Sequence, residues 1–328
     1  MIKAKGNVNR MSLIPFIITV IILIIVEWKV KMPMLLLERF LPGWGWIEIL
    51  LLGTYAGFLF SKLHNTDQSA RWRKISWTIF AVFFFLQLTA GLLGCEKCLM
   101  TGELHFPIPA MILGGAVYRF EFGFMPILFI STVILSGPAW CSQLCYFGAF
   151  DNLAAYSHKI GKKRIKNRNA IKNTFLVLLL FSVILFRIFQ VSVLYAIIGA
   201  GLVGVIGVLI IVFISPGKGK MVHCVTYCPI GTLIQYLKFI NPFRLKIQTN
   251  CTECMICTTK CPYDALNKED IINRKPGLTC TYCGDCLSSC HGNFIQYKFF
   301  GLSPDNARSL YLIITVTLHA VFMGLARI

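Results

Sequence analysis

Long apolar runs alternate with shorter polar stretches along the chain, and they predict most of its secondary structure. A helix of roughly 20 apolar residues crosses the hydrocarbon core of a bilayer. Seven runs have about that length, the fourth being the weakest: 12–28, 46–63, 75–93, 123–139, 171–190, 192–214 and 309–326. The pattern predicts a mainly α fold, a polytopic transmembrane protein with about seven spans.

The first apolar run follows basic residues, as the apolar segment of a signal peptide would. No small-residue cleavage site follows the stretch "IILIIVEWKVKM". We therefore expect residues 12–28 to stay in the protein as a membrane anchor.

The composition agrees with a membrane protein. The chain of 328 residues is 56% hydrophobic and only 14% charged, whereas soluble domains have roughly 25% charged residues. Its mean hydropathy is +0.68. The formal net charge is +18, but the basic residues do not form one face with interleaved aromatic residues, so we expect no nucleic-acid partner.

The basic residues lie in loops, and this predicts the orientation of the chain in the cell membrane. They follow the second run (residues 62–74), separate the fourth and fifth (158–172) and follow the sixth (217–220). Placing the N-terminus in the cytoplasm makes all three stretches cytoplasmic, as the positive-inside rule requires. The loops 29–45 and 94–122 would then be extracytoplasmic.

Eight of the 14 cysteines fall in two runs near the C-terminus. The first run is CxxCxxCxxxCP, as in bacterial ferredoxins, and the second repeats it with His291 in place of the proline. Three closely spaced thiolates bind three irons of one cube, and the fourth serves the other cluster. The predicted ligand sets are Cys251, Cys254, Cys257 and Cys290 for one [4Fe-4S] cluster, and Cys280, Cys283, Cys286 and Cys261 for the second.

A structural zinc site is the alternative, because CxxC pairs also bind zinc. Two complete four-cysteine runs, the first followed by Pro262, favour iron-sulfur clusters instead. Residues 250–297 are therefore predicted to form a small α+β module of the bacterial 2[4Fe-4S] ferredoxin type, on the cytoplasmic side.

Two CxxxC pairs follow predicted spans, Cys141 with Cys145 and Cys224 with Cys228. The i, i+4 spacing puts both thiols of a pair on one helix face. Two such helices could supply four ligands to a further iron-sulfur cluster at the cytoplasmic membrane surface. Alternatively, these cysteines are buried and behave as small hydrophobic residues.

A third pair, Cys95 and Cys98, follows the third span and is assigned to the outer face. It could be a disulfide or dithiol redox pair, half of a metal site, or two cysteines without chemistry. The apolar stretch 107–117 after it is too short to span, and a re-entrant half-helix would fit. His319 in the last span could contact a quinone or haem, but a lone histidine is more often a packed helix residue.

The order of these motifs resembles the NapH and NosR group of membrane-bound polyferredoxins, over roughly residues 123–297. Cys224, Cys228 and Pro229 fit that group's second motif, whereas Tyr146 stands where the first motif has proline. The resemblance implies electron passage between the quinone pool and a redox partner protein or catalytic subunit, as a quinol dehydrogenase or quinone reductase component. It equally implies a role in the maturation of a reductase.

The residues themselves favour electron transfer over substrate conversion. No acid/base or nucleophile constellation and no glycine-rich nucleotide loop is evident, so we predict no catalytic residues. The predicted cofactors are two [4Fe-4S] clusters, one further cluster and a quinone. Two alternative functions remain. The protein could be an assembly or regulatory redox protein, or it could export reducing equivalents to Cys95 and Cys98. The expected domains are 1–93, 94–249, 250–297 and 298–328.

Overall fold

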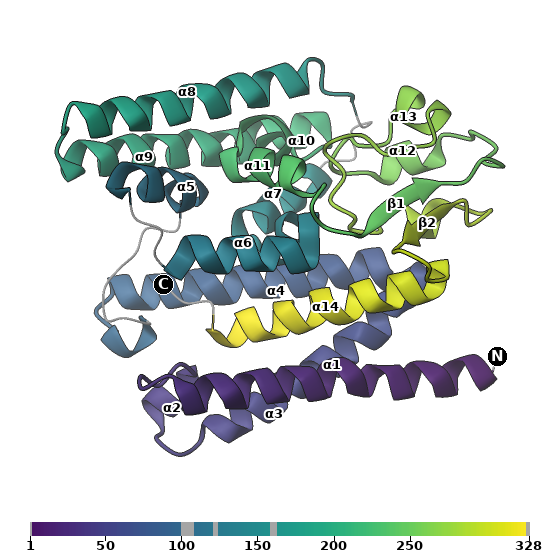
Figure 1. The fold of residues 1–328 in the computed structure, drawn as a ribbon, viewed down its shortest axis with the longest axis horizontal. Helices are drawn as coiled ribbons and strands as arrows, with labels where there is room; N and C mark the ends of the chain where they lie inside the picture. Colours follow the sequence, from purple (N-terminus) through teal and green to yellow (C-terminus); the bar gives the residue numbers. More distant parts are fainter. Residues whose placement is uncertain (1, 100–107, 121–123, 158–162, 326–328) are drawn as a thin grey trace. The chain divides into compact units, whose positions relative to one another are not determined.

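A computed structural model describes residues 2–99, 108–120, 124–157 and 163–325 (Figure 1). The chain forms two compact units. Unit 1 comprises residues 1–106 and 301–328, and unit 2 comprises residues 107–300. The division into four domains made from the sequence alone stays a prediction.

Unit 1 is helical. Its elements are α1 (Ile2–Lys29), α2 (Leu36–Phe40), α3 (Gly45–His64), α4 (Thr66–Leu92), the 3-10 turn η1 (Glu96–Cys98) and α14 (Pro304–Leu325). Helices α1 and α3 approach closely because glycines face α1. A Cβ on Gly53 would lie 2.6 Å from Val20 Cγ2, and one on Gly57 would lie 3.0 Å from the backbone oxygen of Ser12. Small residues four apart permit such close packing of membrane helices.

Helix α14 packs on α3 and completes the core of unit 1. Phe60, Val316 and Ala320 are fully buried in one cluster between these helices. His319 is also buried, and its Nε2 lies 2.9 Å from the hydroxyl oxygen of Tyr55. The histidine is thus a packed, hydrogen-bonded helix residue.

Unit 2 combines helices with the small cysteine-rich module. Its first half contains α5 (Pro109–Arg119), α6 (Phe124–Ser136), η2 (Gly137–Ala139), η3 (Trp140–Leu144), α7 (Tyr146–Ser157), α8 (Arg168–Ile188), α9 (Val193–Leu209) and η4 (Ile210–Ile214). Its second half contains α10 (Ser215–Lys218), η5 (His223–Tyr227), α11 (Pro229–Leu237), β1 (Arg244–Ile247), α12 (Ile256–Lys260), α13 (Lys268–Ile272), η6 (Leu287–Ser289) and β2 (Ile295–Lys298). Helix α5, which packs against α8 and α9, covers most of the stretch expected to be re-entrant (Figure 1); Pro107 lies outside the described residues.

Among the described residues, seven helical segments are long and apolar enough to cross a membrane: Arg10–Lys29, Gly45–His64, Thr66–Leu92, Pro126–Leu144, Arg168–Ile188, Val193–Lys218 and Pro304–Leu325. The predicted mainly α fold with seven spans is confirmed. Helix α4, which contains the third span, begins earlier than the apolar run 75–93. It begins at Thr66 because the Asn65 side chain caps it by accepting the N–H of Asp67 (3.1 Å).

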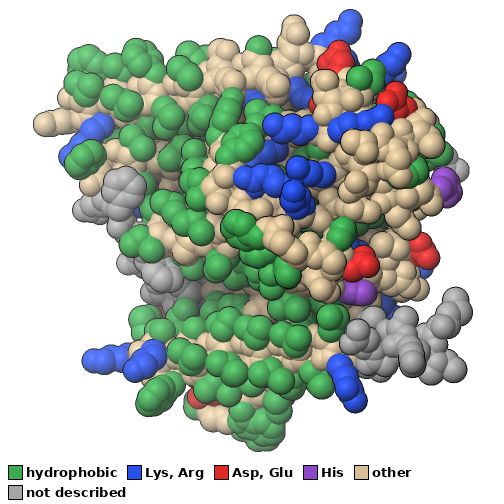
Figure 2. All heavy atoms as spheres, turned by 45° about the vertical axis from the view of Figure 1, so that its right-hand side comes forward, with side chains coloured by type: hydrophobic (Ala, Val, Ile, Leu, Met, Phe, Trp, Pro, Cys, Tyr) green, Lys and Arg blue, Asp and Glu red, His purple; other side chains and the backbone are tan. Residues whose placement is uncertain are grey.

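Large hydrophobic side chains point outward from these helices. Phe181 on α8 is 58% exposed and Phe213 in η4 is 73% exposed. On the face seen in Figure 2, hydrophobic side chains cover the helices, while Lys and Arg gather in separate patches. Exposed apolar surface of this extent fits a multi-pass membrane protein.

The only sheet among the described residues is a two-stranded one that closes the cysteine-rich module. β1 and β2 pair antiparallel, with Arg244 opposite Lys298 and Ile247 opposite Ile295. Since β1 precedes the first cysteine run and β2 follows the second, the pairing holds both ends of the module together. The small α+β module expected from the sequence is therefore present.

Candidate metal centres

The two CxxxC pairs have the same local backbone, and it is not a regular α-helix. The first cysteine of each pair lies in a π-helical turn, Trp140–Leu144 or His223–Tyr227, and the second cysteine follows that turn directly. The N–H of Cys145 donates to Trp140 O (3.0 Å) and that of Cys228 to His223 O (2.9 Å), both five residues back. Both second cysteines are extended, and a new helix starts directly after each. The expectation that each pair lies along one face of a continuous helix was wrong in this detail.

The four cysteines of these pairs nevertheless come together. Cys141 and Cys228 pack in one buried cluster with Ile230 and Ile234. A charge on Cys224 would interact with charges on Cys141, Cys145 and Cys228. We call Cys141, Cys145, Cys224 and Cys228 the CxxxC quartet.

Burial and mutual repulsion disfavour negatively charged thiolates in the quartet when no cation is bound. Burial raises the pKa of the Cys145 thiol to about 12 and that of Cys228 to about 11. Burial and repulsion by neighbouring carboxylate and thiolate charges raise the pKa of Cys224 as well. Three of these cysteines are buried and Cys224 is half-buried. Thiols crowded in this way lose their protons together when a metal cation takes the place of the protons.

A buried carboxylate fixes one cysteine of the quartet. Asp151 on α7 is fully buried, and its Oδ2 accepts the N–H of Cys224 (2.9 Å) while its Oδ1 accepts the hydroxyl of Ser215 (2.5 Å). Burial raises the pKa of Asp151 to about 6. In addition, the N–H of Gly231 donates to the sulfur of Cys228 (3.3 Å). Backbone and second-layer contacts of this kind orient the ligands of a metal site.

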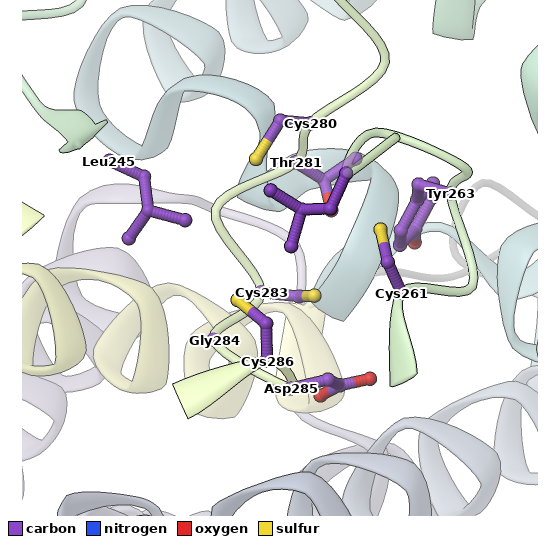
Figure 3. A pocket seen from close by; sticks show the side chains of 10 residues that line it. Leu245, Cys261, Tyr263, Cys280, Thr281, Cys283, Gly284, Asp285 and Cys286 are labelled. Atoms are coloured by element: carbon purple, nitrogen blue, oxygen red, sulfur yellow. The ribbon is translucent and has the colours of Figure 1, made fainter. Parts of the chain in front are cut away.

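The second ferredoxin run encloses a cavity together with the last cysteine of the first run. We call this the inner cavity; Figure 3 draws Cys261 on one loop and Cys280, Cys283 and Cys286 on another, around the same space. Cys261, Cys280 and Cys286 are buried. The N–H of Ala265 donates to the Cys261 sulfur (3.3 Å).

The first ferredoxin run forms a second cavity, which is more open. We call it the outer cavity; its cysteines are Cys251, Cys254, Cys257 and Cys290. Cys254 is exposed, and the other three are half-buried. Burial, followed by repulsion from the other three thiolates, raises the pKa of Cys257 to about 11.

Left-handed backbone turns let each run curl around its cavity. Glu253 and Met255 have φ of 54° and 61° in the first run, and Tyr282 and Gly284 have φ of 55° and 80° in the second. These positions let three cysteines separated by only two residues point into one space. The fourth cysteine of each run lies in the cavity of the other run; the two [4Fe-4S] ligand sets stay a prediction.

The three cysteine groups adjoin one another within unit 2. The hydroxyl of Tyr263, which lines the inner cavity, donates to the backbone oxygen of Cys141 in the quartet (2.9 Å). On the other side, Cys286 of the inner cavity is near enough to Cys257 of the outer cavity for their charges to repel. The inner cavity therefore adjoins both the quartet and the outer cavity.

The type of the candidate ligands and their arrangement around a space both fit iron-sulfur clusters. Soft thiolates select iron-sulfur clusters, zinc or copper. Among the described residues, no three His, Cys, Asp or Glu side chains converge on a single-ion site. A [4Fe-4S] cluster instead takes each thiolate on a different iron, so its ligands surround a space.

The remaining pair lies in unit 1. Cys95 and Cys98 are joined by a disulfide around η1, and both are half-buried. Arg39 holds this turn, because its Nη1 donates to the backbone oxygens of Leu99 (2.5 Å) and Lys97 (3.3 Å).

Comparison with known proteins gives one family and one relative. Residues 119–167 and 200–247 each match the family described as 4Fe-4S binding domain. The two matched segments contain the two CxxxC pairs. An uncharacterized protein of Methanocaldococcus jannaschii is 25% identical over 182 residues, which cover 53% of this chain and 70% of that protein. No solved structure matches the chain.

These matches agree with the chemistry of the three cysteine groups. The matched family is described as binding 4Fe-4S clusters, and two segments of the chain resemble it, both in a region with apolar helices long enough to span a membrane. Together they support a mainly helical, multi-pass iron-sulfur protein with a ferredoxin-like module and a role in electron transfer.

Proposed function

We propose that the protein relays electrons one at a time between the quinone pool and a redox partner protein, as a member of the NapH and NosR group. The observation that carries the proposal is the succession of three four-cysteine groups in one compact unit. A chain of neighbouring sites of this kind suits electron transfer, which needs short steps between centres. A [4Fe-4S] cluster supplies the one-electron chemistry when bound, and the protein holds and tunes it.

The proposed ligands follow the three groups. The inner cavity would hold one cluster through Cys261, Cys280, Cys283 and Cys286, and the outer cavity a second through Cys251, Cys254, Cys257 and Cys290. The CxxxC quartet would hold the third. Its four thiols, its buried surroundings and the N–H bond to the Cys228 sulfur support this assignment.

The two ends of the succession differ in a way that suits their proposed partners. The quartet lies at the ends of the candidate spans Pro126–Leu144 and Val193–Lys218, where a lipid-soluble quinone could approach. The outer cavity carries the exposed Cys254, so a soluble protein could approach a cluster there closely. A cluster in the inner cavity would lie between the other two in the proposed electron path. We place this module on the cytoplasmic side because of the positive-inside rule.

The first test is iron and acid-labile sulfide per chain in anaerobically purified protein, with EPR during a redox titration. About twelve irons would agree with three clusters, and about eight would refute the cluster in the quartet. Cys224→Ser should remove about four irons. Cys95→Ser is the matched control in unit 1 and should leave the iron content unchanged. Absence of any cluster oxidation or reduction by quinones or quinols would refute the quinone relay.

The Cys95–Cys98 disulfide favours a second candidate, the export of reducing equivalents to this pair. Reduction of the disulfide takes two electrons and two protons and yields two thiols. In this case the two thiols reduce the disulfide of an external acceptor to two thiols as Cys95–Cys98 forms again, so Cys95→Ser abolishes electron delivery to that acceptor while quinone-dependent cluster reduction persists. Trapping a mixed disulfide between Cys98→Ser and the acceptor would support it, whereas undiminished delivery by Cys95→Ser would exclude it.

A further inference from the structure

Two lysines are buried beside the inner cavity, on either side of the second CxxxC pair. Lys220 is 3% exposed and precedes η5, and Lys238 is 4% exposed and follows α11. Lysine is almost never fully buried unless it is paired, because removing its charge from water is unfavourable. The positions of their ammonium groups therefore need an explanation.

Lys220 fixes the loop that carries the first-run cysteine of the inner cavity. Its Nζ donates to the backbone oxygens of Cys261 (2.7 Å) and Thr258 (3.1 Å). The N–H of Met221, the next residue, donates to Pro262 O (3.0 Å). The ammonium group thus lies at the backbone of one proposed ligand.

Lys238 does the same for the second run. Its Nζ donates to Leu278 O (2.6 Å) and lies 3.5 Å from Cys280 O, another proposed ligand. It also lies 5.8 Å from the centre of the Tyr282 ring. The inner cavity is therefore flanked by two ammonium groups, one from each side of η5 and α11.

The neighbouring carboxylates do not cancel this pair of charges. Asp264 lies 3.7 Å from Lys220, but Arg168 Nη1 lies closer to its other oxygen, at 2.5 Å. Asp285 lines the cavity as a second carboxylate. Arg244, Lys275 and Asp270 also act on Lys238. Five cations then stand against three anions around the inner cavity, and the balance is positive.

We propose that Lys220 and Lys238 raise the reduction potential of the cluster bound in the inner cavity. This inference rests on the proposed function. A cluster held by four thiolates gains negative charge on reduction, and burial disfavours that charge. The two ammonium groups offset the effect of burial, so that the buried middle site stays in the potential range of the more exposed outer one. The lysines act as tuning residues, since they contact the ligand backbone and not the sulfurs.

The test removes each charge while keeping a hydrogen-bond donor. Lys220→Gln and Lys238→Gln are titrated separately by EPR with soluble mediators, beside Lys220→Arg and Lys238→Arg. We expect each Gln variant to make reduction of one ferredoxin-type signal at least about tenfold less favourable, about 59 mV lower for one electron. The second ferredoxin-type signal should stay in place, and the Arg variants should remain near the wild type.

Lys246→Gln is the matched control, because Lys246 lies on β1 of the same module and is exposed. A shift of the same size in this variant, or unshifted signals in both lysine→Gln variants, would overturn the inference. Each lysine is substituted separately. If one variant fails to retain iron, the potential of the other variant still tests the inference. The titration uses soluble mediators and needs no quinone. Two signals with unshifted potentials would therefore refute only the tuning by the lysines. If the protein does not show two ferredoxin-type signals, the cluster assignment itself is refuted.

Discussion

Tyr263 connects the cysteine-rich module to the CxxxC quartet, and its hydroxyl can be removed without changing its shape. The side chain is 2% exposed, and its hydroxyl donates to Cys141 O at 2.9 Å. Tyr263→Phe keeps the ring but leaves a buried carbonyl without this donor. A typical intramolecular hydrogen bond contributes about 1 kcal/mol, and an unsatisfied buried group costs about 1–3 kcal/mol. We therefore expect the free energy of unfolding to fall by about 1–2 kcal/mol.

Tyr156 provides a matched control in the same unit. Its hydroxyl also donates to a backbone oxygen of the module, that of Lys260, but the bond is long (3.4 Å) and exposed. Water replaces such a bond readily, so Tyr156→Phe should change the free energy of unfolding by about 0.5 kcal/mol or less. Both substitutions remove one oxygen atom from a tyrosine, so the comparison sets a short, buried hydrogen bond against a long, exposed one.

The assay is thermal unfolding of both variants in the same detergent, together with iron analysis. About 1–2 kcal/mol corresponds to a fall in Tm of about 2–8 °C for a unit of this size. Tyr156→Phe should lower Tm by less than about 2 °C. Iron content should match the wild type in both, because neither tyrosine offers a sulfur ligand. Equal falls in Tm, or no fall in Tyr263→Phe, would refute the argument that this buried bond holds the module.

Three further perturbations test other parts of the chain. Asp151→Ala removes the acceptor of the Cys224 N–H, so iron analysis should give about eight instead of twelve irons per chain; twelve would contradict it. Gly137→Ala places a Cβ 2.9 Å from Asn241 Cγ at φ +57°, and thermal unfolding should report a loss of about 1–3 kcal/mol. Two backbone N–H groups lower the pKa of the Glu38 carboxyl, so its contribution to stability is present above the ordinary pKa of Glu and is lost as pH falls through the lowered value. Glu38→Gln should therefore flatten the acid side of the pH–Tm curve.

Hydropathy predicted the spans well, because a bilayer requires long uninterrupted apolar helices. It placed their ends less well where polar residues continue a helix. The third predicted run begins at residue 75, whereas α4 begins at Thr66, and Asn65 caps it through a side-chain hydrogen bond. Capping depends on a local hydrogen bond and not on hydropathy, so a scan for apolar residues does not detect it.

The ligand sets expected from the cysteine spacing stay a prediction, and the spacing did not predict the backbone of the CxxxC pairs. The i, i+4 spacing suggested a regular helix, yet each pair contains a π-helical turn. For Cys228 the sequence held a signal, because a residue before proline disfavours the helical region. Cys145 precedes Tyr146 and adopts the same extended backbone without that signal. Its conformation follows from the tertiary fold.

Buried polar residues around the sites were not predictable from local patterns. Lys220 belongs to the basic stretch 217–220, which was predicted to be a cytoplasmic loop, yet its ammonium group is buried at Cys261 O. Asp151 and Tyr263 likewise gain their roles from residues 73 and 122 positions away. Only contacts between distant segments identify such residues.

Two segments of the chain match the same family description, and each supplies two of the four quartet cysteines. The first segment contains the candidate span Pro126–Leu144 and the second contains most of Val193–Lys218. In each, a π-helical turn carries the first cysteine of the pair, and a short helix follows the second. A [4Fe-4S] cluster takes four thiolates, so one segment alone supplies half of a site. The second segment also carries Lys220, whose contacts reach the inner cavity. A cluster in the quartet would thus depend on the second segment for two of its ligands, and the buried lysine of that segment contacts the ferredoxin-like module.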